Sequence, residues 1–278
     1  LSFGASARGF ELSAYGFSQR VPVLLSTLLD TVVGLEADGA APRRRFATQK
    51  TMLARGLADA DKQSPQGLAS QISQHMTRKL FYLPEQLLEA LEPVTLADLA
   101  NFTRLITAED PSAVEGLVLG NHDGQAATAM LTAASQKLVA AELPFAQRPR
   151  QAVADLSGRH LVHTFRHPNG DEPNSAVQLV VQFGRLDARQ AAVAELLSDM
   201  LKQPFFDELR TKQQLGYIVG SGLSAPQAVY ALGFVVQSAV QPPAEVSRRI
   251  LAFLASAPQI LANASDEFPS YVAAAQTQ

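Results

Sequence analysis

The chain has 278 residues, of which 47% are hydrophobic, and its formal net charge is -3 at pH 7. This length suits two domains of about 140 residues each, the small charge predicts no nucleic-acid partner, and the lack of an apolar run approaching about 18 residues predicts no membrane partner. The chain has no cysteine, which excludes disulfides, zinc-thiolate sites and a cysteine nucleophile.

The first half of the chain is predicted to open with strand structure and then to be mostly helical. Residues 3–15 read as strand, and an amphipathic helix follows from about Val21. Further helices are predicted at 42–57, 65–81, 84–91 and 95–106. A strand at 114–120 and a helix at 124–140 follow, and the proline-containing stretch 142–152 is predicted to be a linker.

The second half is predicted to mix strands and helices without strict alternation. Strands at 159–166 and 176–183 flank a turn-rich segment and are expected to form a hairpin. The remaining elements are predicted to be helices at 188–202, 205–213 and 243–254 and strands at 216–223 and 229–238. This mixture indicates an α+β fold rather than a doubly wound parallel sheet.

A shared spacing of apolar residues links the two halves. Gly16 and Gly184 each end a predicted strand, and apolar residues follow both glycines at offsets 9, 12, 13, 16 and 17. These sets are Leu25, Leu28, Leu29, Val32 and Val33 after the first glycine, and Val193, Leu196, Leu197, Met200 and Leu201 after the second. The shared spacing predicts two homologous α+β domains, 1–147 and 148–278, each a mostly antiparallel sheet packed against helices.

Few residue patterns indicate a complete active site. His160, His163 and His167 are close in sequence, but residues three apart on a strand face opposite ways, so we expect no metal site there. The chain has no H-x-x-E-H or H-E-x-x-H motif, no G-x-S-x-G elbow and no glycine-rich phosphate loop.

Arg210 and Tyr217 are the candidate site residues, on either side of a helix-to-strand turn. In a structural interpretation, Arg210 complements the negative end of a helix dipole and Tyr217 is a strand residue at the rim. In a functional interpretation, a fixed cation and a phenol direct hydrogen bonds at one anion, and Gly216 lets the backbone turn so that they meet. The residues alone leave both interpretations open.

The stretch "ELRTKQQLGYIV" (208–219) closely resembles the C-terminal half of pitrilysin/insulysin-type zinc peptidases, the inverted-zincin family. Four other stretches are similar to that family's third and fourth domains: "GFELSAYGFSQRVPVLLSTLL", "EPVTLADLANF", "VLGNHDGQAA" and "ALGFVVQSAVQPP". The resemblance covers the chain from about residue 9 to residue 255.

This resemblance implies that four homologous domains form two halves that close like a clamshell around a peptide. It implies zinc in the complete enzyme, bound by an N-terminal half on the same polypeptide or a separate chain, and none bound by this chain. Arg210 and Tyr217 would then grip the substrate backbone and stabilise the tetrahedral oxyanion, and this chain alone would be inactive.

The sequence also departs from the family pattern. It lacks the zinc motif, begins at Leu1 rather than methionine and has a short final domain, so we expect a fragment, a processed chain or a shortened relative. The peptidase of pyrroloquinoline-quinone biosynthesis is one such relative. The alternative function is a non-catalytic core or scaffold subunit of the same fold, for which the Arg210–Tyr217 pair has no use.

Overall fold

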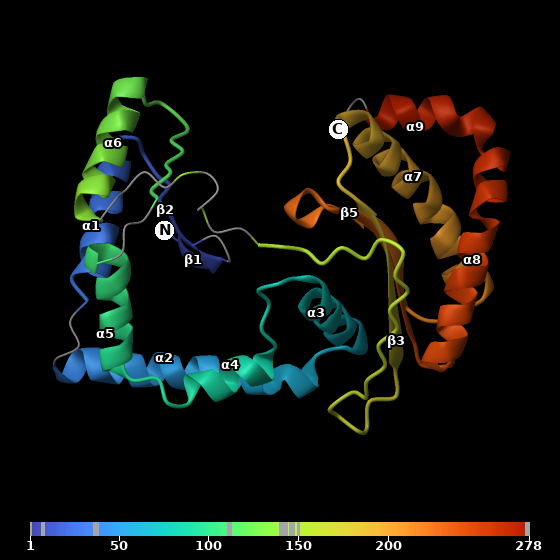
Figure 1. Cartoon of the computed structure of the whole chain (residues 1–278), viewed down its shortest axis with the longest axis horizontal. Coiled ribbons are helices and arrows are strands. Elements are labelled where there is room, and N and C mark those ends of the chain that lie inside the picture. Colours follow the sequence, from blue (N-terminus) through green and yellow to red (C-terminus); the bar gives the residue numbers. More distant parts are fainter. Residues whose placement is uncertain are drawn as a thin grey trace. The chain divides into compact units, whose positions relative to one another are not determined.

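The computed structural model describes residues 2–6, 9–35, 39–109, 113–138, 144, 148 and 151–275. Packing divides the chain into two compact units: Leu1–Leu57 with Glu85–Gln151, and Ala58–Pro84 with Ala152–Gln278 (Figure 1). Within the described residues, no helix is both long and apolar enough to cross a membrane.

The first unit contains a β-hairpin and a group of helices. Strands β1 (Ser2–Ser6) and β2 (Gly9–Ser13) pair antiparallel. The ring of Phe10 stacks on Phe3 with centroids 5.3 Å apart and meets the edge of Phe102 at 5.8 Å. The helices are α1 (Val21–Val33), α2 (Ala40–Ala58), α4 (Pro84–Leu91), α5 (Leu96–Arg104), which continues as a π-helix over Leu105–Glu109, and α6 (Gly124–Lys137).

The second unit contains a three-stranded antiparallel sheet with helices on both faces (Figure 1). The strand order is β3 (Ser175–Gly184), β5 (Tyr230–Ser238) and β4 (Ile218–Ser224). Helix α3 (Pro65–Thr77) lies on one face, and α7 (Ala188–Phe206) and α8 (Pro243–Asn263) lie on the other. The last helix is α9 (Phe268–Ala275).

Local capping explains where several helices begin. A side-chain oxygen just before the helix accepts a hydrogen bond from an N–H group of the first turn, which would otherwise lack a partner. Residues with this role are Ser64 for α3, Thr95 for α5, Asp123 for α6 and Asp187 for α7. These caps lie in the sequence itself, which is why the predicted starts of these helices are within one residue of the observed starts.

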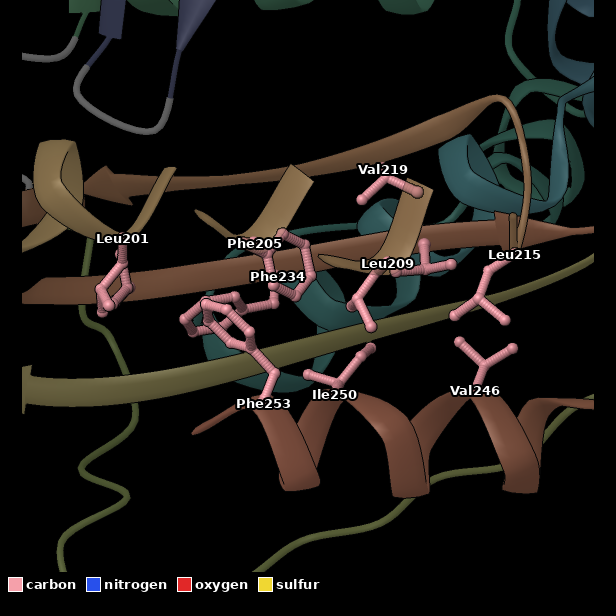
Figure 2. Packing of buried hydrophobic residues seen from close by; sticks show 11 residues of the cluster. Leu201, Phe205, Leu209, Leu215, Val219, Phe234, Val246, Ile250 and Phe253 are labelled. Atoms are coloured by element: carbon pink, nitrogen blue, oxygen red, sulfur yellow. The ribbon is translucent and has the colours of Figure 1, made fainter. Parts of the chain in front are cut away.

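The core of the second unit lies between the sheet and helices α7 and α8 (Figure 2). Alternate residues of β5 point into it, and Phe234 and Val236 are both almost fully buried. Phe205 of α7 meets the edges of Phe234 at 5.0 Å and Phe253 of α8 at 5.1 Å. Such edge-to-face contacts add stability beyond that from the burial of apolar surface. They therefore help to hold α7 and α8 against β5 of the sheet.

Two predicted strands are wrong. Residues 114–120 and 159–166 form no ladder, and exposed apolar side chains mark both, with Leu117 82% and Val162 78% exposed. The predicted hairpin is therefore also wrong, because β3 pairs with β5 instead of with 159–166. An apolar strand-like pattern shows that a segment could join a sheet, but the ladder also requires a partner strand within reach.

The predicted break between helices 188–202 and 205–213 is also wrong. Helix α7 continues through Pro204 to Phe206, and a π-helix follows at once over Asp207–Lys212. The buried residues Leu201, Phe205 and Leu209 are each four apart, so packing along one face keeps the helix continuous through the proline.

The compact units differ from the predicted sequence ranges 1–147 and 148–278. Residues Ala58–Pro84 pack with the second unit, where the backbone of Lys79 donates to the carbonyl of Ala152 at 2.8 Å. In the two helices that suggested a repeat, Val33 and Val193 are exposed, while Leu29 and Leu201 are buried. Homology of the two domains stays a prediction, and most of the predicted linker 142–152 lies outside the described residues.

Candidate functional site

The chain around Arg210 changes from helix to strand within a few residues. The π-helix ends with the backbone N–H of Gln213 donating to the carbonyl of Glu208 at 3.0 Å. The N–H of Leu215 then donates to the carbonyl of Leu209 at 3.0 Å, and Gln214 between them has a left-handed φ of 52°. Leu209 and Leu215 are both buried, so they anchor the two sides of the turn in the core. π-Helical turns of this kind occur frequently at functional sites.

This turn brings Arg210 and Tyr217 together. An Nη1–H of Arg210 donates to the backbone carbonyl of Tyr217, and the guanidinium carbon lies 4.5 Å from the centroid of the Tyr217 ring. The same guanidinium lies 5.3 Å from the ring centroid of Phe206, so it lies close to two aromatic rings. The Tyr217 side chain is 85% exposed, which leaves its hydroxyl open to a ligand.

Gly216 allows this arrangement because the backbone passes very close to β5. A Cβ at position 216 would lie 1.9 Å from the carbonyl oxygen of Gln237, far inside van der Waals contact. On β4, the core residue is Val219, which is 8% exposed, whereas Ile218 is only half-buried. Val219 rather than Ile218 faces the core, because Val219 is the residue paired with the inward-pointing Val236.

A carboxylate of the π-helix fastens the turn. Glu208 accepts hydrogen bonds from the side-chain amide of Gln213 at 2.9 Å and from Lys212 at 3.0 Å. The Gln213 hydrogen bond, followed by that of Lys212, lowers the pKa of Glu208 below its ordinary value. Glu208 therefore stays ionised at neutral pH and holds the segment between Arg210 and Tyr217.

An arginine of α8 connects the turn to that helix. Arg249 donates to Gln213 Oε1 at 3.2 Å and to Glu245 at 2.7 Å. Glu245 also accepts two hydrogen bonds from Arg248, which, together with the one from Arg249, lower the pKa of Glu245 to about 2. Arg249, near the start of α8, thus supports the turn that presents Tyr217.

The histidines are not arranged as metal ligands. His167 Nε2 lies 2.9 Å from the carbonyl of Gln63 and takes part in the local turn, while His163 stacks on Phe165. In the part of the chain that the structure describes, no group of three or more histidine, aspartate or glutamate side chains could hold a metal ion. Among the described residues, the side chains therefore form no ligand set for zinc.

Phe206, Glu208, Gln213 and Arg249 shape the site but were not identified from the sequence. The four-residue spacing of Phe206 and Arg210 on a helix was the one available signal, because residues at that spacing share a face. The partners on α8 could not be identified, since they lie more than thirty residues further along the chain and meet Gln213 only through tertiary packing.

Two family models match the chain. One is described as the middle or third domain of peptidase M16 and matches residues 1–90, and the other is described as PQQ synthase PqqF-like, C-terminal lobe domain 4, and matches residues 196–278. The chain belongs to the peptidase M16 family. The resemblance stated from the sequence is thereby confirmed for the family and for its C-terminal half.

Similar proteins agree with this assignment. The insulin-degrading enzyme of Homo sapiens is 26% identical over 263 residues, which are 93% of this chain and 25% of that protein. A candidate zinc protease of Schizosaccharomyces pombe, mug138, is 30% identical over 241 residues, which are 85% of this chain and 24% of that protein. The crystal structure of pitrilysin matches the fold with a TM-score of 0.70 at 22% identity, covering 93% of this chain and 27% of that chain. The M16 chain thus spans about a quarter of the length of these relatives, and the predicted α+β class is confirmed.

Proposed function

We propose that this chain is the C-terminal half of a zinc-dependent endopeptidase, in which Arg210 and Tyr217 bind the peptide backbone and stabilise the oxyanion of the tetrahedral intermediate. The observation that carries the proposal is the contact between the Arg210 guanidinium and Tyr217 beside an exposed phenol. Membership of the M16 family supports the reaction class.

The two side chains suit an anion that forms during the reaction. A guanidinium is always charged and has five N–H donors, of which the backbone carbonyl of Tyr217 takes one. The phenol adds one directional O–H donor. Since Arg210 is held by a hydrogen bond and two rings before substrate arrives, little reorganisation is required when negative charge develops on the substrate oxygen.

The roles proposed for the two halves of the enzyme follow from where metal ligands could be found. The described residues do not offer a zinc site, so the metal of the complete enzyme would be held by an N-terminal half, on the same polypeptide or a separate chain. The role of this chain is then limited to what its own residues donate. Its substrate would be a peptide that the two halves enclose, and the chain alone would be inactive.

The experiment is kinetic and uses the complete enzyme. Tyr217→Phe keeps the ring over Arg210 and removes one donor, so kcat on a short fluorogenic peptide should fall by about 10²–10³-fold with an unchanged melting temperature. Arg210→Lys should also lower kcat, because an ammonium cannot replace the planar fork. Tyr82→Phe, a similar change at another exposed tyrosine of the same unit, is the matched control.

A Tyr217→Phe enzyme with the kcat of the unmodified enzyme would contradict the proposal. It would favour the alternative, in which the pair only stabilises the turn of a scaffold subunit. Loss of kcat in Tyr82→Phe as well would show that the assay reports general damage and not the oxyanion contact.

A further inference from the structure

Phe206 occupies an unusual place beside the candidate site. It is the last residue of α7, it is half-buried, and one side of it packs against the buried core cluster. The centroid of its ring lies 5.3 Å from the guanidinium carbon of Arg210. Phe206 therefore connects a fixed core to the cation that the proposed function requires.

The two aromatic rings near the Arg210 guanidinium differ in how firmly they are held. Tyr217 is 85% exposed and precedes β4, so its ring is fixed by little apart from the guanidinium itself. Phe206 is anchored through its neighbours in the core, where Phe205 contacts Phe234 and Phe253. Of the two rings, Phe206 alone offers a rigid surface against which the guanidinium can be oriented.

We propose that Phe206 is a positioning residue that holds the Arg210 guanidinium in the orientation needed for the oxyanion, by contact between its ring face and the cation. This inference rests on the proposed function. The role requires an aromatic face and not simply an apolar side chain, because a guanidinium is attracted to the electron-rich face of a ring. The π-helix after Phe206 and the hydrogen bond from Arg210 to the Tyr217 carbonyl fix the remaining degrees of freedom.

The first test measures Arg210 directly in this chain, without substrate. In a ¹⁵N-arginine-labelled sample, the Nε–Hε resonance of Arg210 is assigned by its loss in Arg210→Lys. Phe206→Leu, which keeps apolar volume but removes the ring, should shift this resonance and lower its heteronuclear NOE. Phe206→Tyr should leave both unchanged, because the ring face remains. Phe206→Met provides a second ring-free side chain in case the leucine variant does not fold.

The control is the same substitution elsewhere in the core. Phe253→Leu removes a buried ring that contacts Phe205, so it should lower the melting temperature without altering the Arg210 resonance. In the complete enzyme, Phe206→Leu should lower kcat about tenfold, while Phe206→Tyr and Phe253→Leu should keep it within about twofold at a temperature where all variants are folded.

An Arg210 resonance that is the same in Phe206→Leu and the unmodified chain would overturn this inference. So would an altered resonance with an unchanged kcat in Phe206→Leu, since the orientation would then not matter for the reaction. A wild-type kcat in Arg210→Lys would instead overturn the proposed function. The two failures are therefore distinguishable.

Discussion

Gly216→Ala should damage both the fold around β4 and the candidate site. The added Cβ would lie 1.9 Å from the carbonyl oxygen of Gln237, 3.0 Å from its carbonyl carbon and 3.3 Å from the Cα of Ser238. All three are backbone atoms of the central strand β5, so no side chain can rotate away to make room. The distance from the added Cβ to the carbonyl oxygen would be about 1.5 Å shorter than an ordinary van der Waals contact.

The magnitude follows from this overlap. Overpacking in a well-packed region typically costs about 1–3 kcal/mol, and a clash with backbone on a central strand belongs at the upper end, about 3 kcal/mol. In a unit of this size a loss of about 3 kcal/mol corresponds to a fall in melting temperature of roughly 6–12 °C. The strain lies one residue before Tyr217, so the contact of Tyr217 with Arg210 should be lost as well.

The assay compares thermal unfolding of Gly216→Ala with that of Gly222→Ala, monitored by circular dichroism. A Cβ at Gly222, in the strand β4 that follows Gly216, meets nothing within 4 Å, so that variant should melt at or slightly above the temperature of the unmodified chain. The ¹⁵Nε–Hε resonance of Arg210 reports the state of the site in the same samples. A Gly216→Ala chain that melts with the unmodified chain would refute the argument, because the close approach to Gln237 would then not exist in solution.

Three further predictions follow from other parts of the molecule. The pKa of Glu245 is lowered from 4.5 to about 2 in the folded chain, so its contribution to stability is present above about pH 4.5 and is lost as the pH falls toward 2. Glu245→Gln should therefore lower the melting temperature at pH 7 and reduce its dependence on pH between 5 and 2, and an unchanged acid dependence would contradict this. Ile250→Val, which deletes one methyl group from a fully buried side chain, should cost about 1 kcal/mol in urea unfolding, and a neutral result would argue against tight packing there. Metal analysis of the dialysed chain should find less than stoichiometric zinc, because the described residues form no ligand group, and stoichiometric zinc would reopen the case for His160, His163 and His167.

The family and most of the helices were determined by the sequence alone. The motif at 208–219 involves only residues that are close together in the sequence. The same is true of the helix caps at Ser64, Thr95 and Asp187. The residues that satisfy the first N–H groups of a helix lie within one turn of it, so no knowledge of the rest of the chain is needed. The predicted helix 84–91 coincides with α4, which begins at Pro84, a residue favoured at the first position of a helix.

Strand pairing was decided by the tertiary structure. Residues 159–166 resemble one strand of a hairpin, yet β3 pairs with β5, whose partner residues lie 46 to 63 positions further along the chain. A ladder depends on which segments meet in three dimensions, and the apolar pattern of one segment does not contain that information. The packing of Ala58–Pro84 with the second unit was hidden from the sequence for the same reason.

The candidate site depends both on what the sequence determined and on what the tertiary structure decided. The sequence identified Arg210 and Tyr217 and the need for a glycine between them, because charge, donor type and chain flexibility belong to single residues. Only the fold shows that the guanidinium lies close to two aromatic rings, that the backbone of Gly216 passes close to that of Gln237 and that Arg249 supports the turn from α8. Those contacts join segments that are distant in sequence, and they exist only once the core between the sheet and helices α7 and α8 has brought the segments together.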